Sequence, residues 1–210
     1  MSIVHVMRHG QVYNPGRVLY ERLPDFHLSD LGRDMASKAS RWYEGHPITH
    51  LRCSPLERAQ ETMEPVHALF PDLEVVTDAR VIEAGNELRG QVMGHTAQAA
   101  RDPKNWHLFL HPLRPSWGEA YADMAMRMNA ALRDAADAAG DGEAIIVSHQ
   151  LPIWITRLSA NGRHLWHDPR KRQCTLCSIT TFHLYDGAVA RIEYAEPAGD
   201  LLPNAPHYGF

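Results

Sequence analysis

Short β-branched segments alternate with helical patterns along most of this 210-residue chain, and this alternation constrains its fold more than any other feature. Four strands are predicted, at Ser2–Met7, Thr49–Cys53, Glu74–Thr77 and Ala144–Ser148. Four helices are predicted, from a Ser29 cap to about Tyr43, from a Ser54-Pro55-Leu56-Glu57 capping box to about Leu69, over Trp117–Ala139 with its end at Gly140, and directly after His149. Strands that alternate with helices favour a mainly parallel sheet covered on both faces.

The C-terminal third adds a hairpin to this pattern. Thr175–Tyr185 and Ala188–Tyr194 flank an Asp186-Gly187 turn, which predicts two antiparallel strands at one edge of the sheet. We therefore expect a three-layer α/β/α fold with a mainly parallel sheet and an antiparallel edge. We expect one domain over residues 1–196, with residues 197–210 as its irregular, proline-rich C-terminal tail.

Composition limits the partners that the chain could have. Its net charge is −4 with histidine neutral, so the overall field attracts neither nucleic acid nor an anionic membrane. The longest purely aliphatic segment, Ala144–Val147, is too short to span a bilayer, and the N-terminus lacks a signal-peptide pattern. Three cysteines are too few for a disulfide framework, and a cytoplasmic protein is predicted.

Cationic or potentially cationic side chains follow three of the predicted strands. Arg8 and His9 end the first strand, Arg58 lies just beyond the second, and His149 follows the fourth. In an open α/β sheet, ligands bind beyond the carboxyl ends of the strands. Arg58 is also predicted in the first turn of a helix, where the macrodipole disfavours a cation unless an anion is bound nearby. These positions predict an anion site.

Phosphate binding and transfer suit this set of residues. Guanidinium groups match phosphate oxygens in pairs, and a helix N-terminus adds backbone donors. A neutral imidazole can attack phosphorus and form a phosphohistidine, which divides one displacement into two easier steps. Gly10 would let the backbone turn sharply beside the phosphate.

Three motifs in the same order resemble those of the histidine phosphatase (phosphoglycerate mutase-like) superfamily. RHGQVYN at Arg8–Asn14 resembles the family signature, SPLERAQET at Ser54–Thr62 its second arginine motif, and VSHQ at Val147–Gln150 its second histidine motif. Leu28–Gly32 resembles a helix-start motif of the same family. The resemblance extends from Ile3 to about Ile155 and implies the phosphoglycerate mutase-like fold.

The resemblance also implies roles for individual residues. His9 would be the nucleophile that becomes phosphorylated, and Arg8, Arg58 and His149 would bind the phosphoryl oxygens. Asn14 matches a family asparagine that also reaches the phosphate, although an asparagine before Pro15 could instead serve a turn. No metal ion or other cofactor is implied.

The proton donor to the leaving oxygen is implied to be Glu83, in the segment VIEAGN at residues 81–86. A carboxyl must be protonated for this role, so the nearby phosphate dianion would have to raise its pKa. Glu87, four residues further on, is the rival, and Glu83 could also be a solvated loop carboxylate.

Four positions depart from the family pattern. Gln11 and Val12 replace an acidic residue and a small hydroxyl residue, Arg89 stands where a glutamate is common, and Gln150 stands where a glycine is common. The resemblance places the substrate near the loop before the first helix, which contains Glu21 and Arg22 here. We therefore predict substrate contacts at Asn14, Glu21, Arg22 and Gln150, although Glu21 and Arg22 could be solvated.

Other polar groups of the sequence favour structural roles. His164-x-x-His167 lacks a third metal ligand, so no metal site is predicted. Cys174 and Cys177 are three apart on a predicted strand, so their thiols should point to opposite faces. The run Arg170-Lys171-Arg172 is typical of a solvated turn, and attraction of an acidic substrate tail is the alternative.

The sequence therefore predicts a metal-independent phosphomonoester hydrolase that acts through phospho-His9 on a small phosphorylated metabolite. A phosphoglycerate mutase is the first alternative, but a mutase must cover its intermediate, and residues 83–149 offer mostly one long helix and a proline-rich connection. A catalytically weak phosphate-binding regulatory module is the second alternative, because of Gln11, Val12 and Gln150. Oligomeric state is not indicated.

Overall fold

A computed structural model describes residues 1–85, 89–90 and 118–202. The described residues form a sheet of six strands in the order β3-β2-β4-β1-β5-β6. The strands are β1 (Ser2–Arg8), β2 (Ile48–Cys53), β3 (Val75–Thr77), β4 (Glu143–Ser148), β5 (Ile179–Tyr185) and β6 (Ala188–Ala195). Pairing is parallel from β3 to β1 and antiparallel from β1 through β5 to β6, which confirms the predicted mainly parallel sheet with an antiparallel edge.

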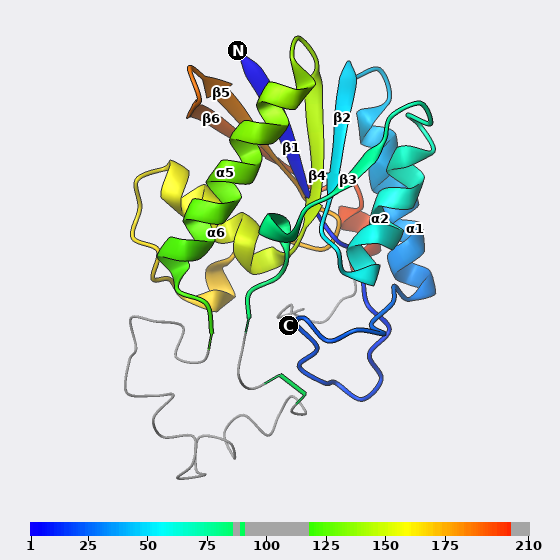
Figure 1. The fold of residues 1–210 in the computed structure, drawn as a ribbon. Coiled ribbons are helices and arrows are strands. Elements are labelled where there is room, and N and C mark those ends of the chain that lie inside the picture. Colours follow the sequence, from blue (N-terminus) through cyan, green and yellow to red (C-terminus); the bar gives the residue numbers. More distant parts are fainter. Residues whose placement is uncertain (86–88, 91–117, 203–210) are drawn as a thin grey trace.

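Helices cover both faces of this sheet, as Figure 1 shows, with α1 and α2 on one side and α5 and α6 on the other. The helices are α1 (Asp30–Ser40), α2 (Glu57–His67), α5 (Tyr121–Ala139) and α6 (Gln150–Ala160). Short 3₁₀ turns are η1 (Arg41–Tyr43), η2 (Ala79–Val81), η4 (Pro169–Lys171) and η5 (Gly199–Leu201). Within the described ranges, no helix is long and apolar enough to cross a membrane.

Alternating side chains of the buried strands build the two hydrophobic layers. In β1, Val4 and Val6 pack with α5, whereas Met7 packs with α1 and α2. In β4, Ile146 joins the α5 layer and Ile145 the opposite one. A strand buried on both faces presents apolar groups on both, which explains the near-continuous apolar runs in the sequence.

The capping-box prediction at Ser54 is wrong, because α2 begins only at Glu57 and its N-cap, Leu56, makes no side-chain cap hydrogen bond. The Ser54 Oγ instead makes its short contact, 2.7 Å, with the Nε2 atom of His149. Its distance to the Leu56 nitrogen is longer, 3.4 Å. A contact across the sheet thus replaces the local cap that the sequence pattern suggested.

Other boundaries also differ from the predictions. β5 begins at Ile179 rather than Thr175, because Cys177 has a φ of 52° and ends an extended path there. Cys174 and Cys177 therefore precede β5, and the prediction that both lie on one strand is wrong; both thiols are free and buried. α5 begins at Tyr121, while Trp117 lies outside the described residues, and it ends at Gly140, where φ is 59°. Of the predicted irregular tail, η5 is described and residues 203–210 are not.

The segment that follows β1 touches the backbone of α1 directly. A Cβ atom added to Gly10 would lie 2.5 Å from the Gly32 carbonyl oxygen, and one added to Gly32 would lie 2.0 Å from the Gln11 carbonyl oxygen. Real Cβ atoms do not approach backbone oxygen so closely. Close packing against α1 is therefore by itself a sufficient reason for a glycine at position 10. The predicted close approach of the Gly10 backbone to phosphate would be a second reason.

The contact between Gly32 and Gln11 gives a prediction for Gly32→Ala, in which helix propensity and steric clash change the free energy of unfolding in opposite directions. Replacing a helical glycine by alanine normally stabilises a helix by about 1 kcal/mol. At Gly32 the new methyl group would displace the backbone of the β1–α1 connection, so Gly32→Ala should lower the free energy of unfolding by about 1–3 kcal/mol. Urea denaturation of both proteins would measure this change in the free energy of unfolding. Gly16→Ala, whose added Cβ has an ordinary 3.4 Å contact, is the control and should change stability little. A stabilised Gly32→Ala protein would contradict the packing.

Candidate active site

Parallel pairing of β1 with β4 brings the predicted site residues together at the carboxyl ends of these strands. Arg8 lies opposite Ser148 in the register, and the backbone N–H of His9 donates to the Ser148 carbonyl over 3.1 Å. His9 and His149 therefore leave neighbouring strands side by side, with ring centroids 5.1 Å apart and planes tilted by 57°. Both rings are almost completely buried.

The hydrogen bond of His9 to its neighbouring carbonyl sets the state of its ring. Nδ1 lies 2.8 Å from the Gly10 carbonyl oxygen, which can only accept, so Nδ1 carries the proton. The lone pair is then on Nε2. Burial, followed by the charges of Arg58 and Arg8, holds the pKa of His9 well below its usual value. The ring is therefore a neutral imidazole with a free nucleophilic nitrogen near neutral pH.

Two buried guanidinium groups accompany these rings. Arg58 is fully buried, its Nη2 donates to the Glu21 carbonyl oxygen, and its guanidinium carbon lies 4.8 Å from the centre of the Tyr20 ring. Its Nε and Nη1 atoms, also buried, have no acceptor among the described residues. Arg8 is 2% exposed and donates through Nη1 to the Cys174 carbonyl oxygen over 2.7 Å. A buried guanidinium with unpaired donors, as in Arg58, favours an anionic ligand.

His149 is oriented by Ser54, a residue whose role sequence reasoning missed. The Ser54 hydroxyl accepts from the Leu56 N–H and can donate its own proton to the His149 Nε2 atom 2.7 Å away. In that arrangement His149 Nδ1 carries the ring proton. It is buried, without an acceptor in the described part of the chain, and lies 4.0 Å from a Glu83 carboxylate oxygen. His149 thus offers an N–H to a ligand between itself and Glu83.

Glu83 lies in the connection after η2, and its carboxylate is 15% exposed. One carboxylate oxygen accepts from the Ala84 N–H over 2.8 Å. Arg22 fixes the backbone, because its Nε donates to the Glu83 carbonyl over 2.6 Å and its Nη2 pairs with Glu119 over 2.9 Å. Arg22 is therefore half-buried support for Glu83 rather than a solvated loop residue. Glu87, the rival acid, lies outside the described residues.

Of the other predicted substrate contacts, Glu21 and Gln150 are linked to the site, whereas the Asn14 side chain bonds a nearby turn. Both ends of the Asn14 amide bond the backbone of Val18, at 2.8 and 2.9 Å, so the side chain closes a turn. Glu21 adopts a φ of 35° and presents its carbonyl to Arg58. Gln150 donates to the Cys174 carbonyl over 3.3 Å, the same oxygen that Arg8 binds, which ties it to the site.

Arg172 is a second residue whose place the sequence did not reveal. Its Nη1 donates to Gln150 over 3.3 Å and its Nε lies 2.8 Å from the Nε2 atom of His167. Burial lowers the pKa of Arg172, and its charge interacts with Glu83 and Arg8. The prediction of a solvated turn is thus wrong for Arg172 and right for Arg170, whose guanidinium is 73% exposed and paired with Asp168. A run of three cations does not show which one turns inward.

The same cluster offers metal-ligand atoms, so its charge decides which ligand it suits. Atoms of His9, Glu83 and His149 that could bind a metal lie within 4.8 Å of one another. Arg58 and Arg8, however, are the charges that act most strongly on the His9 ring. Two buried guanidiniums against one carboxylate repel a divalent cation and attract a phosphate. Both ring nitrogens of His167, in the sequence His164-x-x-His167, already have partners within the protein, the Leu165 carbonyl and Arg172.

The fold and site define an α/β protein whose sheet gathers two buried guanidiniums and two buried imidazoles at the carboxyl ends of its strands. The model of the histidine phosphatase superfamily (branch 1) matches residues 4–196. The chain therefore belongs to the histidine phosphatase superfamily, as its motifs predicted.

Known proteins resemble the chain over nearly its whole length. The uncharacterized protein Rv0525 of Mycobacterium tuberculosis is 44% identical over 196 residues, which cover 93% of this chain and 96% of that protein. A phosphoserine phosphatase from Entamoeba histolytica, in complex with 3-phosphoglyceric acid, matches with a TM-score of 0.71, 16% identity and coverage of 94% and 100%. The mycobacterial glucosyl-3-phosphoglycerate phosphatase Rv2419c matches with a TM-score of 0.69, 23% identity and coverage of 92% and 96%. Likeness at such identities confirms the fold and leaves the substrate open.

The electrostatics of the site predict the titration of His9. In the free protein its ring should be neutral, with the proton on Nδ1, at pH 6.5, where an ordinary histidine is half protonated. Arg58→Met removes one of the two charges that lower the pKa of His9, so that pKa should rise towards its ordinary value. Long-range ¹H–¹⁵N spectra of the ring would follow both proteins. Arg33→Met, which removes a half-exposed guanidinium beside Glu61, is the control. An imidazolium at position 9 of the wild type at pH 6.5 would refute the expected state.

Proposed function

We propose that this protein is a metal-independent phosphomonoester hydrolase that acts on a small phosphorylated metabolite through a phosphohistidine at His9. The observation that carries the proposal is the free Nε2 lone pair of His9, fixed by the Nδ1–Gly10 hydrogen bond. Two buried guanidiniums beside it supply positive charge that a metal ion would otherwise provide.

In the first step, His9 Nε2 attacks phosphorus while the bond from phosphorus to the ester oxygen breaks. Arg8 and Arg58 neutralise the non-bridging oxygens, and the Nδ1–H of His149 donates a further hydrogen bond. Glu83, in its protonated form, gives its proton to the leaving oxygen, so the product is an alcohol. A phosphate dianion beside Glu83 favours the protonated carboxyl, because like charges repel.

In the second step, water attacks the phosphorus of phospho-His9 and the P–N bond breaks. The Glu83 carboxylate takes the proton of the attacking water, which regenerates the protonated acid, and inorganic phosphate leaves. Since the same carboxyl gives a proton and then takes one, its fixed position is essential. Arg22 provides that position through the Glu83 carbonyl.

The substrate proposed is a small phosphorylated metabolite. The solved structures of similar fold include enzymes named for phosphoserine and for glucosyl-3-phosphoglycerate, which supports this class. We place Glu21, Arg22 and Gln150 around the leaving group. Glu21 bonds Arg58, Arg22 bonds Glu83, and Gln150 donates to the same Cys174 carbonyl that Arg8 binds. To bind the phosphate directly, the Asn14 side chain would have to give up its hydrogen bonds to the Val18 backbone and donate to a phosphoryl oxygen instead. Three free, buried thiols fit the reducing cytoplasm proposed as its compartment.

Hydrolysis should therefore depend on His9 and not on added metal. With p-nitrophenyl phosphate in EDTA we expect turnover by the wild type and a loss of about 10³-fold or more in His9→Ala, because the nucleophile is missing. Acid-quenched and alkali-quenched samples should reveal an acid-labile, alkali-stable phosphoryl group on the wild type alone. His164→Ala, an exposed site, is the matched control. Background release from all proteins would indicate a binding module, and loss in EDTA alone a metallohydrolase.

The same protein with 3-phosphoglycerate separates hydrolase from mutase. Free phosphate should accumulate without 2-phosphoglycerate if water is the acceptor. Rapid interconversion of the two phosphoglycerates with little phosphate would establish the mutase alternative instead.

The proposed proton donor predicts a dependence on the leaving group. Glu83→Gln keeps the shape of the side chain but has no proton to give, so hydrolysis of an alkyl phosphate should fall by about 10²–10⁴-fold in kcat. Hydrolysis of p-nitrophenyl phosphate should fall far less, because nitrophenolate leaves without protonation. Equal losses on both substrates would mean that Glu83 only positions other groups.

A further inference from the structure

A second group of polar side chains lies at the other end of the sheet. His5 lies in the middle of β1, Glu143 is the first residue of β4, and His46 lies in the turn that leads into β2. His9 lies four positions beyond His5 along an extended segment, which separates the two residues by about 13 Å. The group is therefore distinct from the candidate active site.

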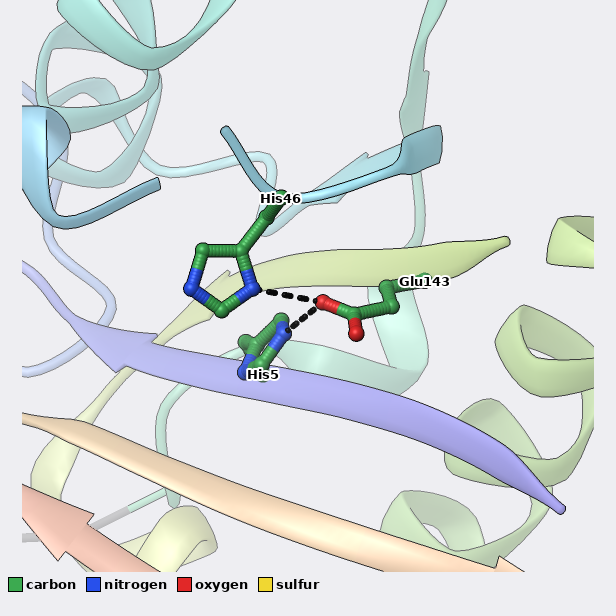
Figure 2. A group of neighbouring side chains, drawn as sticks. All are labelled: His5, His46 and Glu143. Atoms are coloured by element: carbon green, nitrogen blue, oxygen red, sulfur yellow. Dashed lines mark hydrogen bonds and ion pairs between the residues drawn. The ribbon is translucent and has the colours of Figure 1, made fainter. Parts of the chain in front are cut away.

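Both imidazoles of this group point at one carboxylate oxygen, as Figure 2 shows. The Nε2 atom of His5 and the Nδ1 atom of His46 each lie 2.8 Å from the same Oε2 atom of Glu143. The three possible ligand atoms lie within 4.8 Å of one another. Ligand atoms around a tetrahedral zinc ion are about 3.3 Å apart, so small shifts of these side chains would admit a metal ion.

The surroundings hold these rings in place. The His5 Nδ1 atom lies 2.9 Å from the Thr181 hydroxyl, which can donate to it or accept from it. His5 can therefore move its proton from Nε2 to Nδ1, and metal-bound histidines usually have such a partner for the second nitrogen. His46 is stacked on Trp42 with centroids 4.6 Å apart and planes 23° apart, and Trp42 also packs edge-on against His5.

Charge and exposure also suit a cation here. The strongest charged partner of His5 is the Glu143 carboxylate, whereas the strongest charged partners of His9 are guanidiniums. His46 is 31% exposed and Glu143 13%, while His5 is 2% exposed. Solvent therefore reaches one side of the group, where a water molecule could occupy a fourth position.

We propose that His5 Nε2, His46 Nδ1 and a Glu143 carboxylate oxygen bind one divalent transition-metal ion of the zinc type, with water as fourth ligand. Two nitrogens and one oxygen favour zinc, cobalt or nickel over magnesium or calcium. When neutral rings bind, each moves its proton to its other nitrogen, so no proton is released. The ion would join β1, β4 and the turn before β2, and its role is to stabilise the fold.

The test begins with the full-length protein after EDTA treatment and dialysis. Zinc at about one hundred times its Kd should raise the melting temperature by about 5–10 °C, and magnesium should not. Cobalt should produce the intense visible bands of a four-coordinate site. His46→Ala and Glu143→Gln should each abolish both responses, and His164→Ala should keep them.

A second set of variants separates this site from the active site. His9→Ala should retain the zinc response while it loses hydrolysis, and His46→Ala should retain hydrolysis in EDTA at 25 °C. A zinc response that persists in His46→Ala or disappears in His9→Ala would overturn the proposal. An unresponsive wild type would show that the group is only a hydrogen-bonded cluster. If His46→Ala and Glu143→Gln fail to fold, the anomalous signal of a zinc-soaked wild-type crystal decides. A peak among the three residues supports the site and no peak there refutes it.

Discussion

The parallel pairing of β1 with β4 is the contact on which the candidate active site depends. It sets Arg8 opposite Ser148 and lets the backbone of His9 bond the Ser148 carbonyl, so two chain segments far apart in sequence end at the same point. A slip of one residue would exchange the two faces of β1 and move its apolar side chains out of both layers. The core therefore fixes the register, and the register fixes the distance between the two imidazoles.

Burial then gives these residues their chemistry. In water, a histidine beside two arginines would be only slightly perturbed, because solvent screens the charges. Here Arg58 and both rings are enclosed, so desolvation and the guanidinium charges act together to keep the imidazoles neutral. Two donors of Arg58 and one of His149 find no acceptor among the described residues. A phosphate would satisfy them and compensate the charge, so the free site is arranged for its ligand at some cost in stability.

Sequence reasoning succeeded where structure is decided locally. The strands that deliver Arg8, His9 and His149 are short apolar runs with clear ends, so their places could be predicted. It failed at Ser54, where a bond to His149 across the sheet overrides a local cap, and at Cys177, whose left-handed backbone delays β5. Arg172 could not be distinguished from its cationic neighbours, because only tertiary packing decides which one turns inward.

His5, in β1, and His9, directly after the end of β1, show how neighbouring side chains decide which ligand a buried histidine suits. Both rings are buried and both have a lowered pKa, chiefly through desolvation. The carboxyl end of the strand adds guanidiniums, which make the surroundings of His9 attractive to an anion. Towards the amino end, a carboxylate and a second imidazole face His5, which makes that site suited to a cation. Because β4 pairs with β1 along its whole length, the register that brings His149 next to His9 also sets Glu143 opposite Ile3, from where its carboxylate reaches the His5 ring two residues along. The anion site and the proposed metal site are therefore two consequences of one strand pairing.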